Sequence, residues 1–154
     1  MTATPAVRRS WRLLPALGIL GADALSKAWV IRALGGRGVL WVWRPLLSLR
    51  LLYNPGAGLG SGADHAWAAT ILCAGAVALL AFWLLRAERG RFGLTLMLGG
   101  VAGDLAGHLG PGTVADFINL WLWPGIFNLA DVSLRLGAVC FAVGWLRRGQ
   151  PGKR

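Results

Sequence analysis

The stretch AWAATILCAGAVALLAFWLL, residues 66–85, contains twenty residues and no charged side chain. A bilayer core needs roughly 20 apolar helical residues to cross it, and a backbone in lipid must satisfy its own hydrogen bonds, as a helix does. Residues 66–85 therefore predict a membrane-spanning helix. Working outward, three further apolar stretches approach this length, at 13–33, 92–109 and 126–146.

The composition of the whole chain also indicates lipid as its solvent. Of the 154 residues, 56% are hydrophobic and only 14% are charged, whereas a soluble domain of this size needs a more polar surface. The net charge of +10 does not indicate nucleic-acid binding, because the basic residues lie at the ends of apolar stretches and form no single patch. We expect an all-α membrane protein with four transmembrane helices, forming one domain over residues 1–154, and no nucleic-acid partner.

Basic residues are divided unevenly between the two predicted sides of the membrane. One side carries Arg8, Arg9, Arg12, Arg86, Arg89, Arg91, Arg147, Arg148, Lys153 and Arg154. The other side carries Arg32, Arg37, Arg44 and Arg50. The positive-inside rule assigns the more basic side to the cytoplasm. We therefore expect a multi-pass protein of the bacterial cytoplasmic membrane with both termini in the cytoplasm.

The connection between the first two spans, residues 34–65, is predicted to be extracytoplasmic. Within it, residues 38–53 (GVLWVWRPLLSLRLLY) are apolar but too short, and too interrupted by Arg and Pro, to cross the membrane. Ser48 and Arg50 alternate with leucines, and a period of two is typical of a strand. This segment predicts a small β-strand or hairpin that rests on the membrane surface.

Ionisable side chains within the predicted spans are costly in lipid and are candidates for function. They are Asp23, Lys27, Asp104, Asp131 and Arg135, and Asp116 joins them from a predicted loop at 110–125. The acidic residues converge near the predicted outer surface of the membrane. This clustering argues against a transporter or channel, which would need acids spread through the membrane depth. Arg135 is the exception, and we expect it either to snorkel or to pair with an acid.

Asp116 and Asp131 form the pair with the clearest chemistry. Two carboxylates brought close together cannot both ionise easily, so one retains its proton. The ionised member can then take a proton from water while the protonated member donates to the scissile carbonyl. Spacing alone leaves open whether the two meet, because Asp116 is predicted in a loop and Asp131 about five residues into a helix. Asp23 and Lys27, at i and i+4, are either an internal ion pair or groups that orient the site or contact lipid head groups.

Five short blocks carry a resemblance to a known family. They are residues 23–27 (DALSK), 54–60 (NPGAGLG), 99–103 (GGVAG), 114–117 (VADF) and 127–131 (FNLAD). In order, they are similar to the patterns D-x-x-S/T-K, N-x-G-A-x-F, a glycine-rich third span, V-x-D-F and F-N-x-A-D. Leu59 stands in the aromatic position of the second pattern. Together the blocks resemble the lipoprotein signal peptidases (signal peptidase II), a family of membrane aspartic proteases.

The resemblance implies that Asp116 and Asp131 are the catalytic aspartates and that no metal or organic cofactor is needed. It implies a diacylglyceryl-modified prolipoprotein as substrate, an active site at the extracytoplasmic face, contact with membrane phospholipids, a monomer, and inhibition by compounds of the globomycin type. We expect further residues to bind or orient the substrate: Asn54, Gly56, Asn128, Asp23, Lys27, Asp104 and His108.

One block departs from the family pattern. The third span of the family has G-N-x-x-D-R, whereas residues 103–108 are GDLAGH. Asp104 replaces the Asn, Gly107 the Asp and His108 the Arg, so a titratable imidazole stands in place of a permanent cation. We therefore expect an acid-shifted or pH-sensitive activity. The departure also leaves open a second function, an altered or inactive paralogue that binds lipoprotein precursors.

Overall fold

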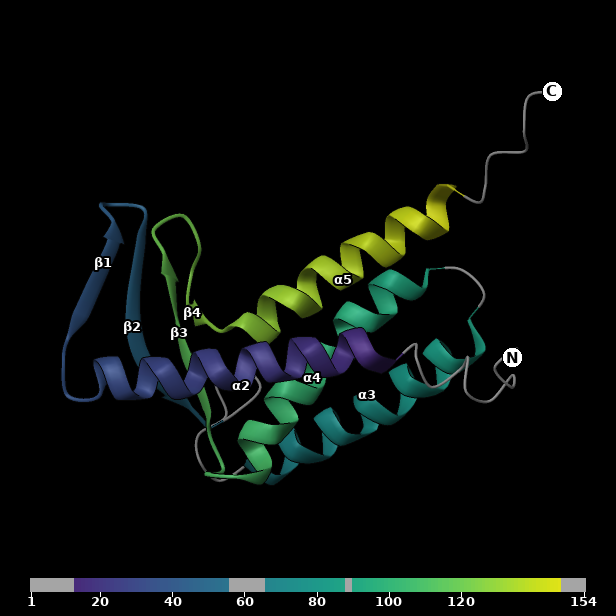
Figure 1. The fold of residues 1–154 in the computed structure, drawn as a ribbon, viewed down its shortest axis with the longest axis horizontal. Coiled ribbons are helices and arrows are strands. Elements are labelled where there is room, and N and C mark those ends of the chain that lie inside the picture. Colours follow the sequence, from purple (N-terminus) through teal and green to yellow (C-terminus); the bar gives the residue numbers. More distant parts are fainter. Residues whose placement is uncertain (1–12, 56–65, 88–89, 148–154) are drawn as a thin grey trace, which may run out of the picture.

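A computed structural model describes residues 13–55, 66–87 and 90–147. Its four helices are α2 (Leu14–Leu34), α3 (Ala66–Arg86), α4 (Arg91–Leu109) and α5 (Leu129–Leu146). Each is long and apolar enough to cross a membrane. The helices form an elongated bundle with a small sheet at one end (Figure 1). The predicted class, a four-helix membrane protein with a small β segment, is confirmed.

The sheet has four antiparallel strands in the order β1-β2-β3-β4. They are β1 (Val39–Trp43), β2 (Leu47–Asn54), β3 (Val114–Leu120) and β4 (Ile126–Phe127). The β1–β2 hairpin confirms the strand signal in residues 38–53. Two predictions were wrong: the segment 110–125 is not simply a loop, and the fourth helix does not begin at residue 126.

The pleat of the sheet separates two environments. On the side of α2, Leu51 and Phe117 pack against Val30 and Leu34. Alternate residues of a strand point to opposite faces, and Leu52, Asn54 and Asp116 accordingly line a cavity on the other side. Leu52 pairs with Asp116. The register of β2 and β3 therefore directs Asp116 away from the α2 core and toward the ends of α4 and α5.

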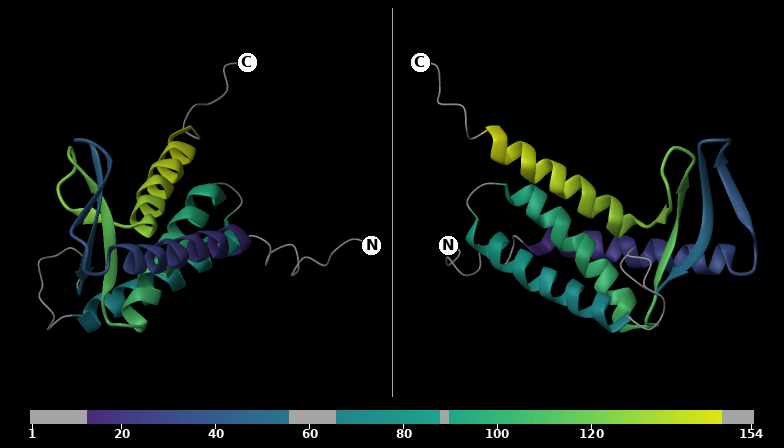
Figure 2. Two further views of the ribbon diagram at one scale, coloured as in Figure 1. Left: turned by 60° about the vertical axis from the view of Figure 1, so that its left-hand side comes forward. Right: turned by 180° about the vertical axis from the view of Figure 1, so that it is seen from behind.

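Helix α4 occupies the centre of the bundle and contacts the other three helices, as the view from behind shows (Figure 2). Half of the apolar stretch of α4 is buried inside the protein, whereas only 11–22% of the corresponding stretches in the other three helices is buried. Glycines permit this close packing: a Cβ at Gly93 would lie 2.6 Å from the carbonyl oxygen of Gly137, and one at Gly100 would lie 2.5 Å from that of Ala130. Small residues that let backbones approach are characteristic of membrane helix interfaces.

The outer faces of the bundle keep large apolar side chains uncovered. All eight tryptophans in the described residues are 44–70% exposed, as are many leucines of α2, α3 and α5. Water would disfavour so much exposed apolar surface, whereas lipid would not. The exposed rings therefore support the prediction that these helices lie in a membrane.

Candidate active site

The start of α5 positions Asn128 and Asp131. Asn128 caps the helix, and its side-chain oxygen accepts the backbone N–H of Asp131 at 2.9 Å. In return, the Asp131 carboxylate accepts the backbone N–H of Asn128 at 3.3 Å, which completes a capping box. Asp131 thus lies in the first helical turn and not about five residues into the helix, as the sequence suggested. The Asn128 cap ends the extended β4 segment and explains that correction.

Strand β3 positions Asp116, whose side chain is almost completely buried (3% exposed). Its two carboxyl oxygens accept hydrogen bonds from amide nitrogens, Nδ2 of Asn128 at 2.8 Å and Nδ2 of Asn54 at 3.1 Å. Burial raises the pKa of Asp116 above its ordinary value. The two amide hydrogen bonds lower that pKa in part, and the negative charge of Asp131 raises it further. Asp116 therefore holds its proton to a higher pH than an exposed aspartic acid does.

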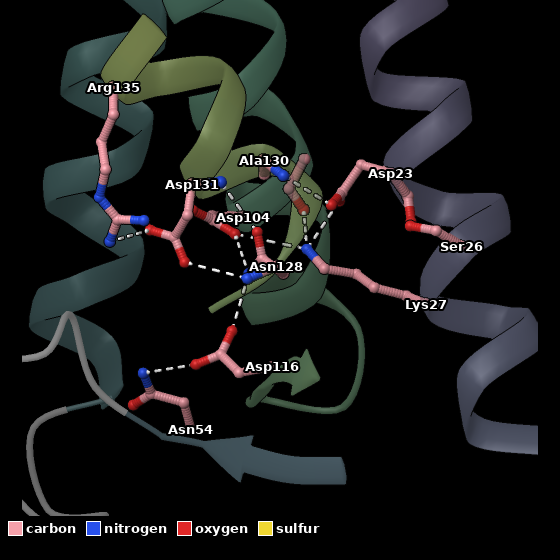
Figure 3. A network of polar contacts seen from close by, with 11 residues as sticks. Asp23, Ser26, Lys27, Asn54, Asp104, Asp116, Asn128, Ala130, Asp131 and Arg135 are labelled. Carbon is pink, nitrogen blue, oxygen red and sulfur yellow. Dashed lines mark hydrogen bonds and ion pairs between the residues drawn. The ribbon is translucent and has the colours of Figure 1, made fainter. Parts of the chain in front are cut away.

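Asn128 connects three elements through one side chain (Figure 3). Besides Asp116 on β3, its Nδ2 donates to Oδ1 of Asp104 on α4 at 3.1 Å. Asp104, Asp116 and Asp131 all line a cavity of about 560 Å³ between the sheet and the helices. Asn54 and His108 line the same cavity. The structure thus brings together residues that are 77 positions apart, from Asn54 to Asp131.

A second cluster of charged side chains, Asp23 and Lys27 with Asp104, lies next to the cavity. Nζ of Lys27 lies 2.7 Å from Oδ2 of Asp23 and 3.3 Å from Oδ1 of Asp104. The other oxygen of Asp23 accepts the backbone N–H of Ala130 at 2.9 Å. The i, i+4 ion pair of the sequence is present, and it links α2 to α4 and α5. Asp23 and Lys27 do not line the cavity, so their contacts with it run through Asp104 and the α5 backbone.

The remaining predicted site residues differ in what the structure describes. His108 is buried on α4, and its Nδ1 has no hydrogen-bond partner among the described residues. Gly56 lies outside the described residues. Of the two possibilities for Arg135, the structure shows pairing with an acid: its ion-pair partner, which the sequence did not name, is Asp131 at 3.3 Å. Their i, i+4 spacing was the available signal.

The cavity can support acid–base chemistry. It presents two carboxyl groups with unequal surroundings: Asp116 is buried among neutral amides, and Asp131 is paired with a cation. Such a difference separates a proton donor from a proton acceptor. In the described ranges, no group of three His, Cys, Asp or Glu side chains could hold a metal ion.

Comparisons with known proteins agree with this architecture. Solved structures of two bacterial membrane enzymes, at 2.3 Å and 1.9 Å resolution, share the fold: the TM-scores are 0.80 and 0.73 at 20% and 22% identity. The alignments cover 94% of this chain and 93% of the first structure, and 90% and 94% for the second.

Sequence comparisons identify the family. A lipoprotein signal peptidase of Xanthomonas axonopodis pv. citri is 36% identical over 86% of this chain and 83% of its own length. One from Burkholderia mallei is 35% identical over 88% and 90%. The family model described as signal peptidase (SPase) II matches residues 15–147. This chain therefore belongs to the signal peptidase II family and is a bacterial multi-pass membrane protease.

Proposed function

We propose that this chain removes the signal peptide from diacylglyceryl-modified prolipoproteins, with Asp116 and Asp131 activating the attacking water. The relatives named above are lipoprotein signal peptidases, which supports the substrate class. One observation carries the chemistry: Asp116 and Asp131 line the same cavity and have different electrostatic partners. Family membership alone would not assign these roles to particular side chains.

In the proposed reaction, the ionised Asp131 accepts a proton from water as the water oxygen attacks the scissile carbonyl carbon. Asp116 is protonated and donates its proton to the carbonyl oxygen, so that a neutral tetrahedral intermediate forms. The C–N bond then breaks, the leaving amine takes the proton from Asp131, and the proton on the hydroxyl returns to Asp116. Both aspartates recover their starting states.

Asn54 and Asn128 orient the Asp116 carboxyl group through the two amide hydrogen bonds. Asp104 and His108 line the cavity, and we assign them, with Gly56, to substrate binding. Asp23 and Lys27 orient the site by holding Asp104 and the start of α5. A residue group of this kind positions the reacting atoms, which is a large part of catalysis.

The location of the cavity suits a substrate with lipid tails. It lies between the sheet and the ends of apolar helices, and its walls include Leu52, Val101, Ile126 and Leu134. The acyl chains of the substrate can remain among membrane phospholipids while the peptide bond enters the cavity. We place this end of the bundle at the extracytoplasmic face, with both termini in the cytoplasm and the enzyme acting as a monomer. A globomycin-type inhibitor would compete for the cavity.

The test is cleavage of a diacylglyceryl-modified precursor by the purified full chain, beside Asp116→Asn and Asp131→Asn. We expect turnover by the wild type and a loss of about 10⁴-fold or more in either variant, as for other enzymes that lose one member of a catalytic unit. Thermal unfolding in the same detergent checks that both variants fold. Retained turnover in either variant contradicts the dyad. Tight binding of the precursor by the wild type without any cleavage favours the inactive-paralogue function instead.

A further inference from the structure

Arg135 is a cavity-lining cation that the mechanism above does not yet use. It lies one helical turn after Asp131 on α5, and its Nη2 is 3.3 Å from Oδ1 of Asp131. Its guanidinium carbon lies 5.3 Å from the centre of the Phe127 ring and 5.4 Å from that of Trp123. Figure 3 shows the guanidinium directed at Asp131. The Arg135 guanidinium thus contacts both the Asp131 carboxylate and two aromatic rings.

The position of Arg135 in an otherwise apolar helix points to a role for its charge. Asp131 and Arg135 are the only charged side chains of α5. An arginine in such a segment is costly unless it is paired, and a guanidinium remains charged at every relevant pH. The Phe127 and Trp123 rings stabilise the cation through their electron-rich faces. A permanent positive charge is therefore fixed beside one aspartate of the pair.

The other aspartate, Asp116, is not ion-paired among the described residues, and the charge of Lys27 affects its pKa less than its burial does. The hydrogen bonds of Asp116 come from two neutral amides, and none of the ion pairs in the described residues includes it. A nearby cation favours the ionised form of a carboxyl group, whereas burial without a cation favours the protonated form. A proton shared between the two groups will consequently reside on Asp116.

The other charged and titratable groups around the cavity do not substitute for Arg135. Lys27 of α2 is engaged by Asp23 and Asp104. Asp104 on α4 carries no positive charge and cannot replace the cation. His108 on α4 and Cys73 on α3 also line the cavity, but neither is ion-paired with Asp131. Among the described residues, Arg135 is the cation paired with Asp131.

We propose that Arg135 is a positioning residue that keeps Asp131 ionised and so assigns Asp131 as the base and Asp116 as the acid. This inference rests on the proposed aspartate dyad. It predicts that removing the cation changes the pH at which the site becomes active without changing how the substrate binds. A merely structural helix pair would affect stability and leave the pH profile of turnover in place.

The experiment measures kcat and KM for the diacylglyceryl-modified precursor across pH with Arg135→Gln, Arg135→Lys and wild type. For Arg135→Gln we expect the acid limb of the kcat profile to move up by about one pH unit. Well below the midpoints of both acid limbs this lowers kcat by about tenfold, which is the limit that a one-unit shift sets, while KM stays within about twofold and the kcat plateau at higher pH persists. Arg135→Lys retains a cation and should restore most of the acid limb.

The matched control is Arg50→Gln, which removes an exposed arginine on β2 that lines a separate cavity beside α2. It should leave the profile unchanged. The side chain of Arg135 is 46% exposed, so Arg135→Gln is expected to fold, and thermal unfolding verifies this. An unmoved acid limb, an equal kcat loss at every pH, or failure of Arg135→Lys to restore activity would overturn the proposal. Turnover by Asp131→Asn would instead remove the dyad itself, and with it this role for Arg135.

Discussion

Polar contacts join the helices and strands around the cavity at the sheet end of the bundle, whereas apolar contacts join the helices at the opposite end. At the sheet end, Asn128 bridges Asp104 and Asp116, and Lys27 bridges Asp23 and Asp104. At the opposite end, the cluster of Ala16, Leu84, Leu94 and Leu98 contains no ionisable group, and α4 meets α5 through Gly93 and Gly137. The difference indicates that one end serves as the scaffold, while the other holds the groups to which we assign the chemistry.

This division has a physical reason. In lipid, helices associate mainly through close packing, so small and apolar residues suffice where only structure is needed. Charged groups are tolerated only where each has a partner. A cluster of five polar or charged residues is therefore tolerated at the sheet end because its hydrogen bonds and ion pairs offset the cost.

The largest expected effect breaks the scaffold end. Gly93→Leu would place side-chain atoms within the space occupied by Gly137 and Phe141, since even a Cβ would lie 2.6 Å from their backbone atoms. Backbone atoms cannot move aside cheaply, so we expect loss of the folded protein from purified membranes. Size-exclusion chromatography in detergent measures this, and a monodisperse, active variant would contradict the packing described for α4 and α5.

The next largest effect concerns the buried ion pairs that Lys27 forms beside the site. Lys27→Met removes the cation that serves both Asp23 and Asp104. Breaking a buried ion pair from one side typically costs about 3–5 kcal/mol, and we expect a loss of stability in that range together with reduced turnover. Chemical denaturation measures the stability. The double variant Asp23→Asn with Lys27→Met should recover part of it, because fewer carboxylates remain unpaired.

A smaller effect separates stability from chemistry. Leu84 is completely buried at the scaffold end (0% exposed), and Leu84→Ala should lower the unfolding free energy by about 2 kcal/mol through the cavity it leaves. Turnover per folded molecule should not change, because Leu84 packs in the apolar cluster at the scaffold end and does not line the cavity that holds the aspartates. A selective fall in kcat at full folding would show that the two ends are coupled.

The smallest effect on stability concerns Asp116 and depends on pH. The folded state raises the pKa of this carboxyl group, so its contribution to stability is fully present below about pH 4 and is lost as the pH rises through the raised pKa. Asp116→Asn cannot ionise. Its thermal stability relative to wild type should therefore increase from acid to neutral pH, while its activity is absent at both. A difference that stays constant with pH would contradict the burial of an ionisable Asp116.

Much of this arrangement follows from local sequence. Long apolar stretches predicted all four helices, and the alternation around Ser48 and Arg50 predicted a strand or hairpin where the β1–β2 hairpin lies. Patterns of this kind depend on neighbours along the chain. The positions of the acidic residues near one end of the predicted spans also indicated a site.

What sequence alone missed depends on contacts between distant segments. β3 forms a strand because it pairs with β2, which lies some 60 residues earlier in the chain. Its own sequence did not predict a strand, because Asp116 and Asn119 interrupt the apolar pattern. The fourth helix starts at Leu129 because the side-chain oxygen of Asn128 accepts the backbone N–H of Asp131 and so caps the helix. The bridge from Asn128 to Asp104 and Asp116 likewise has no local signal. Tertiary pairing thus decided which side chains share the cavity.

The central claim is that one aspartate of the pair is protonated while the other is ionised. Infrared spectroscopy of the purified enzyme in lipid detects a protonated carboxyl group directly. We predict such a band at neutral pH in wild type, its loss in Asp116→Asn and its retention in Asp104→Asn and Asp131→Asn. A wild-type spectrum without the band, or a band that disappears only in Asp104→Asn, would contradict the account.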